Sequence, residues 1–247
     1  MASTSALGLI HVGGPTVLVE MAGVRFLVDP TFDQPGDYPV GTRVLTKTRP
    51  PRVGPEVVGP VDAVLLSHDQ HPDNLDTSGR SLLTTVPLVL TTTTAAGRIE
   101  GPARGLDPWA SVEVGRVTVT AVPAQHGPDG TEHLTGPVTG FVLSAAGHPT
   151  VYVSGDNASL DVVAEISRRH PVVDVAILFA GAARTPLVDG FLTLTAPQVV
   201  EAARLLGEPQ VLVVHADSWA HFTEGEDDVR AAFAASGLEH LLVSARP

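Results

Sequence analysis

The segment of residues 65–76 constrains what this chain can fold into more than any other part of the sequence. It follows an apolar run at residues 61–66 that predicts a buried strand. Within nine residues it then places two His, three Asp, a Gln and an Asn. Imidazole and carboxylate groups presented from one loop suit a borderline cation such as zinc, because neutral nitrogen and anionic oxygen are both among its preferred donors. The alternative is a polar turn in which Asp73 or Asp76 caps a helix over residues 75–83.

Three later segments also end a strand on a residue of ligand type. The apolar, β-rich runs at residues 117–122, 150–153 and 211–214 lead to His126, Asp156 and His215. Four such strand ends in one chain are hard to explain as separate core residues. They favour a single metal site that is assembled from several strand ends.

The order of these residues resembles the metallo-β-lactamase superfamily, whose signature is a His-x-His-x-Asp-His loop followed by a His, a bridging Asp and a final His. More narrowly, it is similar to the branch of L-ascorbate-6-phosphate lactonase-like and N-acyl-phosphatidylethanolamine phospholipase D-like proteins. That branch opens with a Gly/His turn, an apolar hairpin and an Asp-Pro, matched here by residues 11–14 and 28–30. Judged by motif order, the resemblance extends over about residues 7–242.

The signature loop departs from the family pattern because it carries one extra residue. Counted back from Asp73, His71 takes the second His position and Asn74 replaces the final His. Counted forward from His68, Gln70 takes the second His position instead. We favour His68, His71 and Asp73 as ligands, and whether Gln70 or His71 faces the metal stays open.

The resemblance implies a site for two ions, with zinc as the expected metal. His68, His71 and His126 would hold one ion, Asp73 and His215 would hold the other, and Asp156 would bridge them. An amide is a weaker donor than imidazole, so we expect Asn74 to leave the second ion loosely held and open to manganese or iron, unless His133 or His221 supplies a ligand.

We predict a metal-dependent hydrolase in which a metal-bound hydroxide attacks a small ester, lactone or phosphodiester. The predicted catalytic residues are Asp73, Asp156, Arg184 and His221. Arg184 lies on a small-residue loop after a predicted strand, where a cation suits an anionic substrate. Ser67 and Ser154 lack the His-Asp relay of a serine nucleophile, so we interpret them as hydroxyls that fix loops. The alternative is a non-catalytic or sensory metal-binding protein that keeps the fold with an altered second metal site.

Strand and helix patterns predict an α/β fold, the four-layer αββα sandwich of the metallo-β-lactamase type. Residues 7–12, 16–21 and 24–28 have strand patterns, and residues 160–170, 197–206 and 227–235 have helical ones. Residues 29–60 are rich in Pro and Gly and show little periodicity. We expect an irregular segment there that could form a wall or lid over the site.

Composition limits the class of protein and its partners. With 247 residues, 43% hydrophobic, and no linker, we expect one domain over residues 1–247. The net charge of −12 argues against nucleic acid or an anionic membrane as partner. We expect a small-molecule substrate, and homo-oligomers stay open. The absence of cysteine excludes disulfides, thiolate ligands and cysteine nucleophiles. Residues 1–6 show no leader pattern, and no run approaches the ~18 apolar residues of a membrane span, so we expect a cytoplasmic protein.

Overall fold

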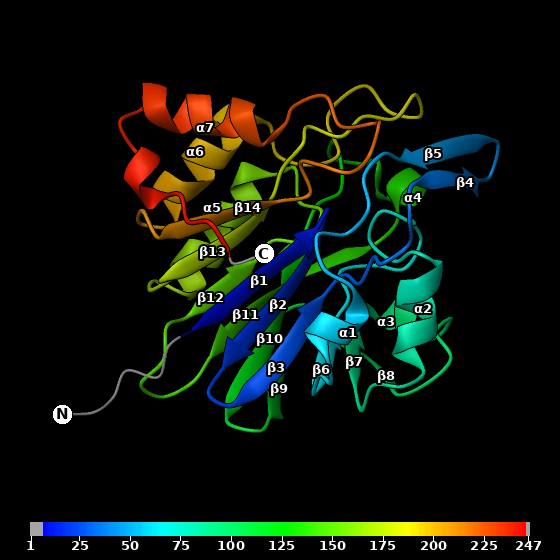
Figure 1. The fold of residues 1–247 in the computed structure, drawn as a ribbon. Coiled ribbons are helices and arrows are strands. Elements are labelled where there is room, and N and C mark those ends of the chain that lie inside the picture. The colour runs from blue at the N-terminus through cyan, green and yellow to red at the C-terminus, as the bar shows by residue number, and fades with distance from the viewer. Residues whose placement is uncertain (1–6, 246–247) are drawn as a thin grey trace.

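A computed structural model describes residues 7–245 of the chain. Residues 1–6, for which no leader was predicted, lie outside the described part. Two six-stranded sheets form the centre of the molecule, and helices cover their outer faces (Figure 1).

The first sheet has the strand order β1-β2-β3-β6-β7-β8. Strands β1 to β3 are antiparallel neighbours, whereas β6, β7 and β8 run parallel to β3. The strands are β1 (Gly8–Gly13), β2 (Thr16–Met21), β3 (Val24–Val28), β6 (Ala63–Leu65), β7 (Val89–Thr91) and β8 (Ala103–Gly105).

The second sheet has the strand order β14-β13-β12-β11-β10-β9. Its strands are β9 (Ser111–Val114), β10 (Val117–Ala124), β11 (Val138–Ser144), β12 (Val151–Val153), β13 (Val175–Phe179) and β14 (Gln210–Val214). Strand β11 is antiparallel to both β10 and β12, and β13 and β14 run parallel to β12. Strands β10, β12, β13 and β14 therefore end at the same edge of the sheet, where the loops after them meet.

Alternating side chains build the layers. In β2, Val17 and Val19 pack into the core between the two sheets, whereas Leu18 faces the helices on the outer side. In β13, Ile177 faces the same inner core and Leu178 packs on the helices of the other side. A strand with apolar residues at every position is expected where both of its faces are covered.

Three helices cover each outer face, with the cores of the two faces formed separately. The first sheet is covered by α1 (Pro55–Val58), α2 (Thr77–Leu83) and α3 (Thr93–Ala96), and the second by α5 (Leu160–Arg169), α6 (Ala196–Leu205) and α7 (Glu226–Ala235). The predicted αββα sandwich is confirmed.

Residues 29–60 are not the irregular segment that the sequence predicted. They contain the hairpin of β4 (Gly36–Val40) and β5 (Arg43–Lys47), paired in register through a turn at Gly41, where φ is +60°. The hairpin was missed because most of its side chains are exposed or half-buried, so it has no apolar alternation. It stands beside the upper edge of the sandwich (Figure 1).

Other differences are smaller. The short strand β8, the one-turn helix α4 (Glu132–Thr135) and a 3₁₀ turn at Glu239–Leu241 were not predicted. The loop after β6 does cap a helix, since the Asp76 carboxylate accepts from the N–H of Gly79 over 2.8 Å. Both the capping role and a ligand cluster therefore occur in one loop. Within residues 7–245, no helix is both long and apolar enough to cross a membrane.

Candidate metal centre

The loop between β6 and α2 carries the first donors, and a buried carboxylate at the end of β3 fixes its start. The backbone N–H and the hydroxyl of Ser67 both donate to Asp29, over 2.6 Å each. Because the hydroxyl proton points to Asp29, its oxygen is free to accept from Nδ1–H of His68, 2.9 Å away. The proton on Nδ1 leaves Nε2 of His68 as the nitrogen with a free lone pair.

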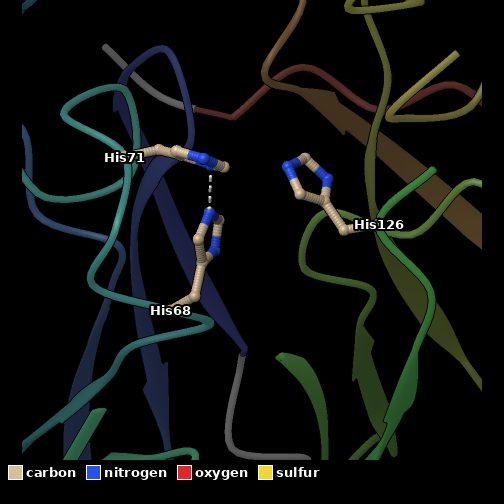
Figure 2. Close-up of side chains that lie close together, drawn as sticks. All are labelled: His68, His71 and His126. Carbon is tan, nitrogen blue, oxygen red and sulfur yellow. Dashed lines mark hydrogen bonds between the residues drawn. The ribbon is translucent and has the colours of Figure 1, made fainter. Parts of the chain in front are cut away.

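Three histidines bring their ring nitrogens together, two from this loop and one from the end of β10 (Figure 2). One nitrogen each from His68, His71 and His126 lies within 4.8 Å of the others. Nε2 of His68 and Nδ1 of His71 are 3.0 Å apart. Nδ1 of His126 donates to the carbonyl of Leu192 over 3.0 Å, so Nε2 of His126, buried and without a hydrogen-bond partner, is the available donor atom.

A second group consists of Asp73, Asp156 and His215, all buried, with their ligand atoms also within 4.8 Å of one another. His215 directly follows β14 and has a left-handed φ of +56°, which costs a non-glycine residue energy and is typical of functional positions. Its Nε2 lies 3.3 Å from Oδ2 of Asp73 and 3.6 Å from Oδ1 of Asp156, yet it makes no hydrogen bond.

Asp156 stands between the two groups. Its Oδ2 is 3.6 Å from Nδ1 of His126 and 4.0 Å from Nε2 of His68. Its other oxygen, Oδ1, is 3.6 Å from Nε2 of His215. One carboxylate oxygen therefore lies near each group, so Asp156 could serve as a ligand to both ions.

Burial and mutual charge set the protonation of these side chains. Burial lowers the pKa of His68 well below its ordinary value and that of His71 to about 4, so both rings are neutral near pH 7. Burial also disfavours the charged form of His215, but the carboxylates of Asp156 and Asp73 outweigh it and raise its pKa to about 9. Burial alone would raise the pKa of Asp73, but attraction to His221 and His215 and hydrogen bonds with them hold it well below its ordinary value.

Several of the candidate donor atoms have no hydrogen-bond partner within the protein, as expected for atoms that bind a divalent cation. Nε2 of His126, Nε2 of His215 and Oδ1 of Asp73 are buried without hydrogen-bond partners. Buried polar atoms in this condition are costly unless a partner satisfies them. A pair of ions would do so, held by the three histidines on one side and by Asp73 and His215 on the other, with Asp156 shared.

The sequence left open whether Gln70 or His71 faces the metal, and the positions of the two side chains bear on this choice. His71 is part of the nitrogen cluster. The side-chain oxygen of Gln70 accepts from the N–H of Asp69 over 3.1 Å, and Asp69 itself pairs with Nε of Arg98 over 3.0 Å. The one-residue insertion in the loop therefore falls at Asp69 and Gln70, whose side chains make these hydrogen bonds and ion pairs instead.

A pocket opens beside the donors. Besides His71, Asp73, His126 and Asp156, it is lined chiefly by Arg43, Leu45, Arg184, Thr185, Leu192 and His221. All four residues predicted to be catalytic, Asp73, Asp156, Arg184 and His221, therefore face one pocket. Half of the Arg184 side chain is exposed, and its one ion pair among residues 7–245, with Asp189, is long at 3.7 Å.

Sequence reasoning gave no role to Asp29 beyond the Asp-Pro pattern. Its Oδ2 accepts from Nδ2 of Asn74 over 3.1 Å as well as from Ser67, so one carboxylate orients both ends of the donor loop. Burial raises the pKa of Asp29 to about 7. The available signal was its place at the end of β3, the strand that pairs directly with β6.

Comparison with known proteins identifies the family. The family model described as the beta-lactamase superfamily domain matches residues 24–216. The chain belongs to the beta-lactamase superfamily. The match spans the donor loop, His126, Asp156 and His215, and it ends five residues before His221.

The chain is also similar to individual metal-dependent hydrolases and to solved structures. A metal-dependent hydrolase of Methanosphaerula palustris is 29% identical over 181 residues, which cover 69% of this chain and 75% of the relative. The isothiocyanate hydrolase from Delia radicum gut bacteria superposes with a TM-score of 0.82 at 22% identity, covering 95% of this chain and 94% of that one. A possible metal-dependent hydrolase from Veillonella parvula gives 0.84 at 19% identity, with 98% and 97% covered. At these identities the two structures show a shared fold.

Proposed function

We propose that this chain hydrolyses a small anionic ester, lactone or phosphodiester with a pair of zinc ions. At the coarser level it is a metal-dependent hydrolase of the beta-lactamase superfamily. The observation that carries the finer proposal is the pocket in which members of both donor groups lie next to two arginines, Arg43 and Arg184.

The donor set supports zinc as the resident metal. Neutral imidazole nitrogen and carboxylate oxygen are common zinc donors, and the chain has no cysteine to add a thiolate. Bound ions of this kind polarise the substrate and make water nucleophilic near neutral pH. The two carboxylates of Asp73 and Asp156 would balance part of the charge of both ions.

The nucleophile in this proposal is water, because the nearby hydroxyls are already engaged. The Ser67 hydroxyl donates to Asp29 over 2.6 Å, and the Ser154 hydroxyl donates to the carbonyl of Gly155 over 2.8 Å. Both serines are buried. The Ser67 hydroxyl contacts His68, but Nδ1–H of that ring donates to it, so His68 cannot act as its base within a Ser-His-Asp relay.

The pocket wall supports a small, negatively charged substrate. Arg184 and Arg43 supply positive charge at the rim, and Arg43 is fixed by donating to the hydroxyl of Thr185 over 2.5 Å. Leu45 and Leu192 line the same pocket and add apolar surface to it. A guanidinium suits carboxylate and phosphate groups because its N–H donors match their paired oxygens.

The test combines metal analysis with a substrate panel. Metal per chain is measured on purified protein, and chromogenic esters, lactones and phosphodiesters, together with an isothiocyanate, are assayed before chelation, after it, and after zinc is restored. We expect activity on at least one anionic substrate that is lost on chelation and regained with zinc. Two bound ions with no hydrolysis across the panel would favour the non-catalytic metal-binding alternative.

A further inference from the structure

The position that would complete the second metal group in the family signature is occupied by Asn74, and the NH₂ end of its amide is already engaged. Nδ2 of Asn74 donates to Oδ1 of Asp156 over 3.0 Å and to Oδ2 of Asp29 over 3.1 Å. Both partners are carboxylates, so the NH₂ end of the amide has to face them. Asn74 therefore orients the shared carboxylate through its NH₂ end, while its Oδ1 is buried without a hydrogen-bond partner. The His and Asp side chains that the signature positions give to the second group are Asp73, Asp156 and His215.

A histidine from another part of the chain stands beside this group. Nε2 of His221 lies 3.0 Å from Oδ2 of Asp73, and Nε2 of His215 lies 3.3 Å from the same oxygen. Donors held about 2.0–2.1 Å from one tetrahedral ion are roughly 3.3 Å apart, so these separations suit neighbouring ligands. The other nitrogen of the ring, Nδ1, is buried and has no hydrogen-bond partner.

We propose that His221 is the fourth protein ligand of the second metal ion and takes over the role that the signature histidine at position 74 would have. This rests on the metal centre of the proposed function and adds a ligand from outside the signature. The second ion is then held by two histidines and two carboxylates, Asp73, Asp156, His215 and His221.

The backbone after β14 holds His221 at the site. His215 and Ser218 both have left-handed φ values, +56° and +72°, in the seven residues that end at His221. The N–H of Ala220 donates to the carbonyl of Thr46 in β5 over 3.0 Å. The loop is thus tied to the β4–β5 hairpin, and a merely mobile surface histidine would not be held in this way.

The ring of Phe222 packs on both histidines. Its centroid lies 4.6 Å from that of His215 and 4.6 Å from that of His221. The side chain of His221 is only 16% exposed. His221 lies outside the two donor groups whose atoms are all within 4.8 Å of one another, but it contacts Asp73 directly. His133, the other residue that the sequence offered as a replacement, is exposed on α4.

The first experiment measures metal binding without substrate, so that its outcome does not depend on whether the panel of substrates contains the right one. Chelator-stripped wild type, His221→Ala and the matched control His133→Ala are titrated with cobalt(II) and with zinc. We expect two ions in the wild type and the control. In His221→Ala we expect the first ion to bind unchanged and the second to bind at least about 10-fold more weakly. Unchanged binding of the second ion would overturn the proposal.

The second experiment separates a ligand from a hydrogen-bond partner of Asp73. Because the chain has no cysteine, His221→Cys introduces its sole thiol. At cobalt concentrations that fill both sites, a coordinating thiolate gives a sulfur-to-cobalt charge-transfer band in the near ultraviolet. We expect this band in His221→Cys and none in the control His133→Cys. No band in a His221→Cys protein that holds two cobalt ions would make His221 a positioning residue and overturn the proposal.

Discussion

At the scale of single residues, the site depends most on Asp156, since it alone has one oxygen facing each donor group. We expect Asp156→Ala to remove most of the bound metal and all hydrolysis, because both ions lose a ligand and Asn74 loses one of its two hydrogen-bond partners. Metal per chain and activity are the measurements. Asp161→Ala, at an exposed position on α5, is the control and should keep both. Full metal content in purified Asp156→Ala would refute a shared ligand.

His126 gives a narrower expectation, because it belongs only to the histidine group. His126→Ala should empty that group first and leave the ion near Asp73 and His215 in place. Cobalt titration distinguishes the two sites by the order in which they fill. Equal weakening of both ions would mean that the groups act as one unit.

Arg184 is expected to act on substrate and not on metal. Its guanidinium lines the pocket but makes no contact shorter than 3.7 Å with a carboxylate among residues 7–245. We expect Arg184→Ala to raise KM for an anionic substrate by about 10-fold or more, at unchanged metal content, because a charge-assisted hydrogen bond contributes on the order of 1.5–3 kcal/mol.

The exposed Arg168→Ala on α5 serves as the control for this change of charge. Neutral substrates should be processed by Arg184→Ala and wild type alike. A KM that does not change for any charged substrate would assign Arg184 a structural role.

At the scale of elements, the loop after β13 packs against His215, the residue that directly follows β14. Gly181 has φ +92°, and a Cβ there would lie 2.4 Å from the carbonyl oxygen of His215. We expect Gly181→Ala to displace His215 and weaken metal binding, in addition to about 1–2 kcal/mol of backbone strain. Gly147→Ala is the matched control, because Gly147 has φ +78° but nothing within 4 Å. Equal loss of stability with intact metal binding in both variants would show that His215 tolerates the shift.

The elements also show what the sequence could and could not predict. Strands such as β2 and β13 were predictable because they are apolar on both faces, and the ligand types at their ends could be identified one by one. The β4–β5 hairpin lacks apolar alternation, so nothing local indicated it. The approach of His221 to Asp73 depends on left-handed backbone at His215 and Ser218 and on a tie to that hairpin. Such long-range geometry leaves no spacing pattern in the sequence.

At the scale of the whole molecule, the donors connect the two sheets. The loop with His68, His71 and Asp73 belongs to the first sheet, whereas His126, Asp156 and His215 follow strands of the second. The net charge of −12 makes the arginines at the pocket a local exception in a negative surface. The overall charge repels an anionic substrate at long range, so capture should depend on short-range contacts with these arginines, and added salt should reduce the repulsion.

Because both sheets supply ligands, metal should stabilise the packing of one sheet on the other. Ions that bind the folded chain alone stabilise it by about 2.7 kcal/mol when free metal exceeds Kd 100-fold. For a chain of this length that corresponds to a rise in Tm of roughly 5–10 °C. We expect chelation to lower the Tm by that amount and zinc to restore it. Asp156→Ala should lack this response, and Gly147→Ala should keep it. A Tm that is indifferent to metal in the wild type, with two ions bound, would mean that the sheets hold together fully without them.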